Sequence, residues 1–260
     1  MKKSPGAYGC TGVFFMKKWI IGICILSAAA ICAELAVLAS AVSRIPNLET
    51  AALPGEAAIV IRNGDPDSKQ LALTCNVDWG EDVLPELLEI LREKKAPVTF
   101  FVTGQWAGKH PDLVRRMYLE GHDVQSHGYS HKLCSRISAE EVREEMTRTE
   151  AAISDILGYK VTVFAPPSGD YNEETLKLCR EFGYTLSLWS ADTIDWKPGS
   201  TADVIRQRIL KKPLSGAIVL MHPKEETARA LPGLIDAIRK RGIEIVPLEN
   251  FICRKSEKGV

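Results

Sequence analysis

The stretch LALTCNVDWG, residues 71–80, holds the pattern that decides the fold of this chain. An apolar run of strand length, Leu71 to Asn76, ends there in polar and turn residues. Such a run is typical of a strand buried on both faces, as in a parallel sheet. The next residues, 83–94, place four leucines at the spacing of one buried helix face, and Asp82 is the expected N-cap. The stretch therefore predicts a strand followed by a helix.

This strand–helix unit recurs along the chain. We predict seven strands, at Leu71–Asn76, Val98–Val102, His122–Gln125, Val161–Ala165, Thr185–Trp189, Ala217–Met221 and Ile243–Pro247. Between the third and fourth strands, Ser138 and Glu141 form a capping box that begins a helix, and Gly158 ends it. Strict alternation of strands and helices predicts an α/β fold with a parallel sheet or barrel.

Five of the seven predicted strands end in polar or turn residues. These residues are Asn76 and Asp78, His127 and His131, the segment 166–170, Asp192 and Asp195, and His222. The carboxyl ends of parallel strands meet on one face, where barrels and doubly wound sheets carry their active sites. We therefore expect one face of the molecule to gather the titratable side chains.

Two histidines four residues apart, His127 and His131, follow the third predicted strand. Imidazoles at this spacing can reach one ion, and neutral imidazole suits Zn²⁺ and its first-row neighbours. Asp78 is the best candidate for a third ligand because it also follows a strand. Gly128 stands where a zincin helix would carry its glutamate, so that motif is excluded. The residues alone leave two interpretations open, a metal site and a chance spacing.

Seven short motifs stand in a fixed order, at residues 71–80, 98–102, 121–124, 127–131, 164–167, 192–196 and 220–222. Together they resemble the polysaccharide deacetylases, the NodB-homology family or carbohydrate esterase family four. The resemblance extends from Ala57 to Phe251. Within the family it is closest to the sporulation-associated single-domain branch, because that branch shares the Asp-Trp-Gly ending of the first motif.

The resemblance implies a distorted (β/α)7 TIM-like barrel and a hydrolase acting on non-peptide C–N bonds. The implied reaction is metal-dependent removal of an acetyl group from an N-acetylated glycan, either peptidoglycan or a chitin-like oligomer. Asp78, His127 and His131 would hold the divalent ion, Zn²⁺ first and Co²⁺ or a similar ion second. Such an ion polarises a carbonyl and lowers the pKa of bound water to about 7.

Three more residues take roles by the same resemblance. His222 would protonate the departing amine, and Asp195 would orient His222 and stabilise its imidazolium. The backbone N–H of Ser168 would hold the oxyanion of the tetrahedral intermediate. From the residues alone, two other interpretations stay open: Asp195 as part of a turn and His222 as a structural residue at a strand end.

Two positions depart from the family pattern. Asn76 stands where the family has the aspartate that acts as general base, and Ala165 stands where an arginine pairs with that base. The losses are coupled, because a buried arginine without its carboxylate would be an unpaired charge. Metal binding thus looks intact while the usual base is missing. An active enzyme would rely on metal-bound hydroxide with His222, or on Glu81 or Asp82 from the loop.

Three functional hypotheses follow from the sequence. The first is a metal-dependent deacetylase with an atypical site. The second is a catalytically impaired glycan-binding pseudoenzyme. The third is another metal-assisted amidohydrolase. Release of acetate separates the first two, because a binding protein retains affinity for the glycan without turnover.

The N-terminal residues predict export. Lys17 and Lys18 precede the apolar residues 19–42, which are long enough to span a bilayer, and Ala39-Ser40-Ala41 resembles a cleavage site. We interpret residues 16–42 as a signal peptide or a transmembrane anchor, and 1–15 as an upstream extension, with Met16 as an alternative start. We assign residues 43–56 to a linker, 57–253 to the NodB-like domain and 254–260 to a tail. The domain would be membrane-anchored and extracytoplasmic, or secreted after cleavage.

The remaining features are less specific. Lysine and arginine total 33, as do aspartate and glutamate, so the net charge is zero and nothing indicates nucleic acid as a partner. The seven cysteines show no metal-ligand spacing. We interpret Cys75, Cys134, Cys179 and Cys253 as small buried hydrophobic residues, with a disulfide among them left open. His122 begins its strand, so we assign it a structural role.

Overall fold

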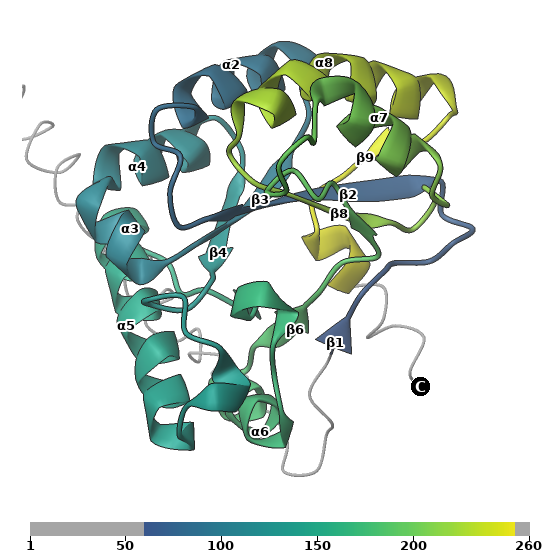
Figure 1. The fold of residues 1–260 in the computed structure, drawn as a ribbon. Coiled ribbons are helices and arrows are strands. Elements are labelled where there is room, and N and C mark those ends of the chain that lie inside the picture. The colour runs from purple at the N-terminus through teal and green to yellow at the C-terminus, as the bar shows by residue number, and fades with distance from the viewer. Residues whose placement is uncertain (1–59, 253–260) are drawn as a thin grey trace, which may run out of the picture. The chain divides into compact units, whose positions relative to one another are not determined.

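One curled, parallel β-sheet forms the centre of the computed structural model, which describes residues 60–252 (Figure 1). Its strands are β1 (Val60–Ile61), β2 (Gln70–Val77), β3 (Val98–Val102), β4 (Asp123–Ser126), β5 (Val163–Phe164), β6 (Thr185–Ser187), β7 (Ala191–Asp192), β8 (Ile218–Met221) and β9 (Glu244–Ile245). The strand order is β1-β6-β5-β4-β3-β2-β8-β7, and β9 also pairs with β2. The ladders are parallel, so all these strands end on the same face of the sheet.

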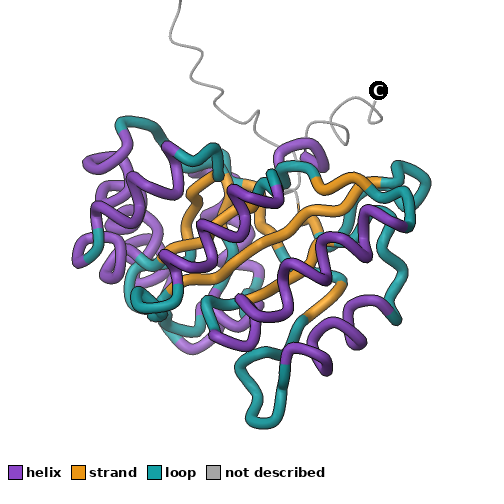
Figure 2. Tube along the Cα trace, turned by 90° about the horizontal axis from the view of Figure 1, so that it is seen from above, coloured by secondary structure: helices purple, strands orange, loops and turns teal. Residues whose placement is uncertain are grey.

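Helices connect most of the strands and lie outside the sheet (Figure 2). They are α2 (Leu84–Lys94), α3 (Gly104–Lys109), α4 (Pro111–Leu119), α5 (Ala139–Leu157), α6 (Glu173–Phe182), α7 (Ala202–Leu210) and α8 (Glu225–Lys240). Two short 3-10 helices, η1 (Cys134–Arg136) and η2 (Pro167–Gly169), lie in the loops that follow β4 and β5. This arrangement confirms the predicted α/β class.

The predicted distorted barrel is confirmed in a coarser form, as a curled half-barrel with two strands more than expected. The described chain forms nine strands, because the two-residue strands β1 and β7 add to the seven predicted ones, and the ladder is an open half-barrel. β1 and β7 lie at the two ends of the strand order. An isolated antiparallel bridge between Asn63 and Ala217 links the chain after β1 to the start of β8.

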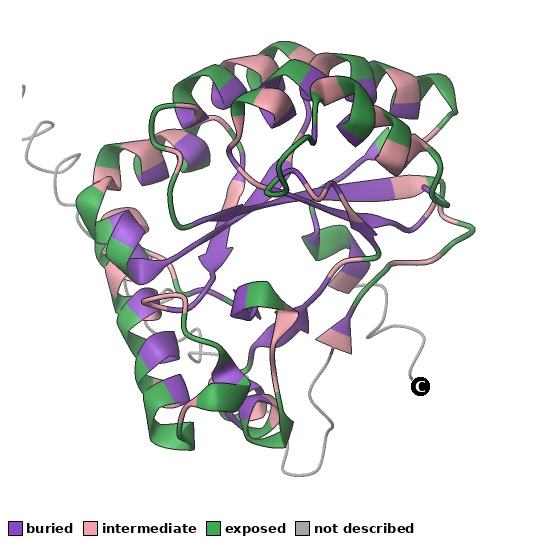
Figure 3. Ribbon diagram, in the orientation of Figure 1, coloured by how far each residue is buried: buried purple, intermediate pink, exposed green. Residues whose placement is uncertain are grey.

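The strands of the curled sheet are buried along most of their length (Figure 3), and apolar side chains fill both of its sides. The larger cluster lies between sheet and helices and includes Leu73, Phe100 and Leu88. The smaller cluster lies on the inner face and includes Ala72, Phe101, Val163, Ala165 and Ile218. Side chains alternate along a strand, so one strand serves both clusters.

The helix ends follow the sequence except at α2. The Ser138–Glu141 capping box is present at α5, and Gly158 ends that helix in the left-handed conformation. The prediction of Asp82 as the N-cap of α2 is wrong, because Val83 takes that position without a side-chain cap. The Gly80 carbonyl accepts the N–H groups of Val83 and Leu84, so a backbone turn replaces the side-chain cap.

The predictions for residues 1–15, 16–42, 43–56 and 254–260 lie outside the described residues. Within residues 60–252, none of the helices combines the length and the apolar character that crossing a bilayer requires.

Candidate active site

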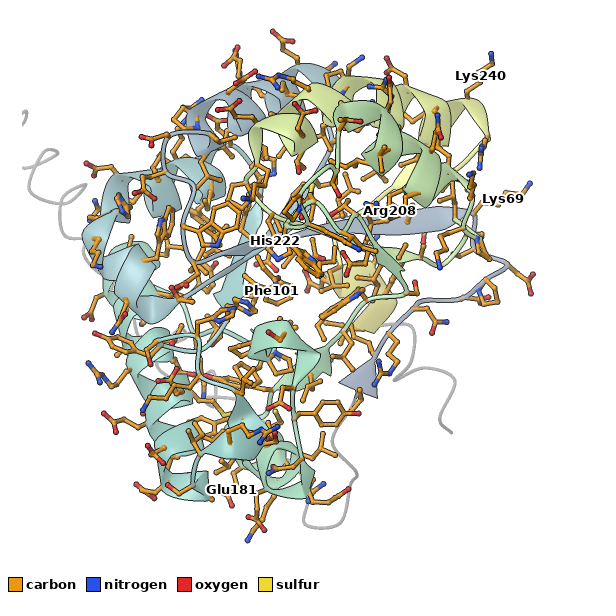
Figure 4. The ribbon with its side chains drawn as sticks, viewed as in Figure 1. Lys69, Phe101, Glu181, Arg208, His222 and Lys240 are labelled. Carbon is orange, nitrogen blue, oxygen red and sulfur yellow. The ribbon has the colours of Figure 1, made fainter. Side chains whose placement is uncertain are left out.

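A hollow of about 380 Å³ opens at the carboxyl ends of the strands. It brings together all the residues assigned a site role from the sequence except Asp195. Its lining consists of Asn76, Asp78, Trp79, His127, His131, Ser168, Trp189, Asp192, Trp196, Leu220 and His222. In the side-chain view, His222 and Phe101 both lie over the middle of the sheet (Figure 4).

The register of the strands explains why these side chains share one hollow. Thr74 of β2 pairs with Leu220 of β8, and Leu220 pairs in turn with Asp192 of β7. Paired residues of parallel strands project to the same face, and so do residues two apart along a strand. Asn76 and His222, each two residues further on, therefore face the same side as Leu220 and Asp192.

His222 is held by a buried carboxylate. Its Nδ1 lies 2.7 Å from Asp195 Oδ1, and its backbone N–H donates to Asp195 Oδ2 at 2.7 Å. Thr227 Oγ1 also donates to Oδ2. The Asp195 side chain is 0% exposed and that of His222 is 17% exposed. Asp195 therefore lies behind His222, which presents its free Nε2 side to the hollow.

The charge of Asp195 depends on these donors. Burial acts to raise the pKa of its carboxyl, but the hydrogen bonds from His222 and Thr227 outweigh burial and lower that pKa. An ionised carboxylate on Nδ1 favours the imidazolium that forms when His222 has a proton to donate.

His127 has the properties of a neutral ligand. Burial, followed by the neighbouring His131, lowers the pKa of His127 to about 3. Its Nδ1 lies 2.7 Å from the carbonyl oxygen of Ala165, a contact that a neutral ring makes by donating its Nδ1–H. The Nε2 lone pair is then available, and the carbonyl fixes the ring as outer-shell partners of metal ligands do.

The loop that carries the second histidine is held by Glu145 of α5. The Glu145 carboxylate accepts the backbone N–H groups of Tyr129 and Ser130 and the Ser130 hydroxyl. His131 follows with φ of 58°, and its ring lies 5.1 Å from that of His127, between centroids. Sequence analysis missed Glu145. The sequence pattern that could have revealed it is an acidic residue on the buried face of a helix, next to Met146.

Asp78 lines the same hollow, and its Oδ1 accepts a hydrogen bond from Thr103 Oγ1 at 2.8 Å. Two imidazoles and a carboxylate form a donor set suited to a divalent metal. In residues 60–252, however, no group of three or more His, Cys, Asp or Glu side chains is placed so that it could hold a metal ion as it stands. The donor atoms of Asp78, His127 and His131 are thus of the kind that binds a divalent metal, but their positions do not converge on one coordination point.

The two departures from the family pattern lie in the interior. Asn76 is 6% exposed and lines the hollow, and Ala165 is 5% exposed within the inner apolar cluster. Ala165 still contributes its carbonyl to His127. Position 165 therefore places no arginine beside Asn76.

Ser168 occupies a turn after β5 with φ of 57°. Pro166 and Pro167 have no N–H, and the N–H groups of Gly169 and Asp170 donate to the carbonyls of those prolines. Among the N–H groups of this turn, that of Ser168 is therefore the one that does not donate to a carbonyl of the turn itself.

Exposed aromatic rings flank the hollow. Trp79 is 38% exposed and Trp196 is 56% exposed. Both also line a second hollow of about 510 Å³, with Asp82 and the first residues of α8. The Trp79 ring stacks on His222, and Lys224 Nζ lies 4.5 Å from the Trp79 centroid. These aromatic side chains were not assigned from sequence.

Other candidates lie away from the hollow. His122 is 5% exposed and packs edge-on against Phe100, as its structural assignment requires. Cys75, Cys134 and Cys179 are free and buried, which confirms their prediction as small core residues, while Cys253 lies outside the described residues.

The fold and the hollow define a class: a parallel α/β sheet with a site of histidines and carboxylates at the carboxyl ends of its strands. Comparison identifies the family, because residues 63–187 match the polysaccharide deacetylases. The chain is also 34% identical to a wild-type family 4 carbohydrate esterase pseudoenzyme from Bacillus anthracis, with a TM-score of 0.73 over 75% of this chain and 69% of that one. The chain belongs to the polysaccharide deacetylase family.

Two further relatives bear on function. The uncharacterized protein YlxY of Bacillus subtilis is 33% identical over 70% of this chain and 57% of YlxY, so the chain spans little more than half of that relative. The peptidoglycan-N-acetylglucosamine deacetylase of Bacillus cereus is 29% identical over 75% of this chain and 73% of that protein.

Proposed function

We propose that this chain removes acetyl groups from an N-acetylated cell-wall glycan. The single observation that carries the proposal is the His222–Asp195 pair at the hollow, because a histidine on a buried carboxylate is the group a departing amine needs. Membership of the family and the named activity of the Bacillus cereus relative support the choice of amide and glycan.

The residues would act in sequence on the acetamide. The Ser168 N–H stabilises the oxyanion that forms when water adds to the acetyl carbonyl. His222 then donates a proton to the sugar nitrogen as the C–N bond breaks, and Asp195 stabilises its imidazolium before that transfer. The products are acetate and the free amine of the sugar.

We propose that Asp78, His127 and His131 hold a divalent metal, with Zn²⁺ first and Co²⁺ or a similar ion second. When bound, such an ion would polarise the acetyl carbonyl and acidify water. The neutral state of His127 and its contact with the Ala165 carbonyl support this assignment. The Thr103 hydroxyl would orient Asp78 in the same way.

A glycan-binding pseudoenzyme is the second candidate, and Asn76 is the specific observation that favours it. An amide cannot accept the proton that the family's aspartate takes. A Bacillus anthracis relative is itself described as a pseudoenzyme, and a mutant of that protein as having restored enzymatic activity. Another metal-assisted amidohydrolase is the third candidate.

Acetate release tests the proposal. The purified domain, loaded with Zn²⁺ or Co²⁺, is incubated with peptidoglycan fragments and with a chitin oligomer. We expect acetate from the wild type and a loss of about 10²- to 10⁴-fold in His222→Ala, as for removal of a general acid. Tight glycan binding without release of acetate would establish the pseudoenzyme instead. If the domain neither binds the glycan nor releases acetate, an amidohydrolase with another amide substrate is the candidate that remains.

We also propose that the domain lies outside the cytoplasmic membrane. The support is the sequence pattern of residues 16–42, and an exported domain would meet a cell-wall glycan directly. The domain would lie outside the membrane in either case, whether residues 16–42 are retained as an anchor or cleaved as a signal peptide.

A further inference from the structure

The hollow lacks the carboxylate that usually accepts the proton of the attacking water, and the two substitutes expected from the sequence do not reach it. Glu81 accepts a hydrogen bond from Trp106 Nε1 at 3.3 Å and is absent from the lining. Asp82 lines the neighbouring hollow instead. If the chain is an active hydrolase, another acceptor must therefore face the substrate.

Among the described residues, two carboxylates line the hollow, Asp78 and Asp192. Asp78 accepts the Thr103 hydroxyl and belongs to the donor set assigned to the metal. The third nearby carboxylate, Asp195, is 0% exposed behind His222 and is used by three hydrogen bonds. Asp192 is the one that remains.

Asp192 is the last residue of β7, and its position relative to His222 follows from the sheet. It pairs in register with Leu220 of β8, and His222 lies two residues beyond Leu220 on the same side of that chain. Asp192 and His222 thus face one hollow from adjacent strand ends. A proton donor and a proton acceptor at neighbouring strand ends are what amide hydrolysis requires.

The surroundings of Asp192 hold its carboxylate in place and tune it. Its Oδ1 accepts the backbone N–H of Ile194 at 2.7 Å, which fixes the rotamer. Burial raises the pKa of its carboxyl, and Asp195 on the same loop acts in that direction. The Ile194 N–H, His222 after β8 and Arg208 of α7 oppose the rise. A base whose pKa moves toward the working pH is a better proton acceptor.

We propose that Asp192 is the general base of this chain in place of the missing aspartate at position 76. It takes one proton from water as the water oxygen bonds to the acetyl carbon. His222 supplies one proton to the nitrogen as the C–N bond breaks, so acetate and amine leave with the proton count balanced. The inference rests on the proposed deacetylase function.

The test compares Asp192→Asn with wild type on the metal-loaded domain. Asparagine keeps an oxygen for the Ile194 N–H, so the turn is preserved while the base is removed. We expect kcat to fall by about 10²- to 10⁴-fold with KM little changed. Partial activity in Asp192→Glu and loss of the acidic limb of the pH–rate profile in Asp192→Asn are also expected. Asp155→Asn, at an exposed position of α5, is the matched control and should equal wild type.

A second variant tests the inference by rescue. Adding Asn76→Asp to Asp192→Asn supplies a carboxylate elsewhere in the hollow and should recover part of the turnover. Wild-type turnover in Asp192→Asn would overturn this inference and leave the deacetylase intact. An Asp192→Asn defect in kcat with an unchanged pH profile would reduce Asp192 to a structural role. No acetate from wild type would remove the proposed function and this inference together.

Discussion

At the scale of single residues, the site differs from its family by two side chains that belong together. Asn76 and Ala165 are both nearly buried, and neither has the charge that its family counterpart carries. A lone charge placed at either position would lack its partner in a poorly solvated interior. The substitutions are therefore best understood as one exchange of an ion pair for a neutral pair.

This coupling predicts non-additive mutants. Asn76→Asp alone would place an unpaired carboxylate in the hollow, and Ala165→Arg alone would bury an unpaired cation among apolar residues. We expect a modest gain from the first and lower stability from the second. The double mutant should exceed the sum of the singles in acetate release, because the arginine supplies the charge partner that the new carboxylate needs. A double-mutant cycle with a chitin or peptidoglycan oligomer measures this.

The outcome also separates the functional candidates. Metal- and His222-dependent acetate release by wild type indicates an enzyme with altered base chemistry, and release only by the double mutant indicates a retired site. If neither protein releases acetate while both bind metal, the deacetylase proposal should be abandoned.

Metal binding gives a second prediction at this scale. We expect one tightly bound Zn²⁺, Co²⁺ or similar ion per domain and its loss in His127→Ala, because the neutral imidazole of His127 is a proposed ligand. Elemental analysis of the purified domain checks the stoichiometry. His122→Ala is the control, since that buried ring lies away from the hollow and its removal should leave the metal content unchanged. Absence of metal from wild type would refute the prediction.

His122 makes stability depend on pH. Both ring nitrogens are buried without a hydrogen-bond partner among the described residues, and burial lowers the pKa of His122 below 6.5, against the opposing effect of Glu120. As the pH falls below 6.5, His122 of the unfolded chain therefore binds a proton before His122 of the folded chain does. The free energy of unfolding then decreases by up to about 1.4 kcal/mol for each pH unit. His122→Leu should flatten this loss in denaturant unfolding of the metal-free domain. Identical pH curves for the two proteins would contradict it.

Site residues were predictable where a strand ends in an unusual side chain. His127 and His222 directly follow strands, and His131 lies four residues after His127, so their common face could be derived from the alternation of strands and helices. Glu145 and Thr103 could not be found this way, because they act through hydrogen bonds between segments distant in the sequence. Asp192 was predicted as a strand-end residue. Its proposed role as a base depends on the structure, which shows that Glu81, Asp82 and Asp195 do not line the hollow.

At the scale of elements, most of the strands were predictable from the sequence. Each of the seven predicted strands corresponds to a strand of the sheet, and β3 has the predicted bounds. β1 and β7 were missed, although β5 and β9 are equally short and were predicted. The place of β1 and β7 in the sheet comes from long-range pairing with β6 and β8, which the local sequence does not encode.

The capping box of α5 gives a prediction at this scale. Ser138 Oγ accepts the Glu141 N–H, and the Glu141 carboxylate accepts the Ser138 N–H in return. Ser138→Ala should lower the free energy of unfolding by about 0.5–2 kcal/mol, as for other lost N-caps. Ser154→Ala in the same helix is the control and should change it little. Equal effects of the two variants in urea unfolding would show that the box does not contribute.

At the scale of the whole molecule, the parallel sheet explains why one hollow holds nearly all the chemistry. Every ladder runs the same way, so the polar residue after each strand arrives on one face, while the strands themselves supply the two apolar layers. The sheet is a curled half-barrel whose edge strands, β1 and β7, do not pair with one another, and this shape agrees with the distorted barrel that the resemblance implies.

Placement of the chain in the cell is the last prediction, and it rests on the sequence of residues 17–42. Two lysines ahead of an apolar stretch favour retention of the lysines in the cytoplasm and transfer of the domain, from Ser43 onward, across the membrane. Protease added to intact cells, after loosening of the wall, should therefore digest the domain while a cytoplasmic marker survives. Replacing Lys17 and Lys18 by glutamate should weaken this orientation. A domain protected in intact cells and digested only after lysis would place it in the cytoplasm, where it could not reach an exported cell-wall glycan.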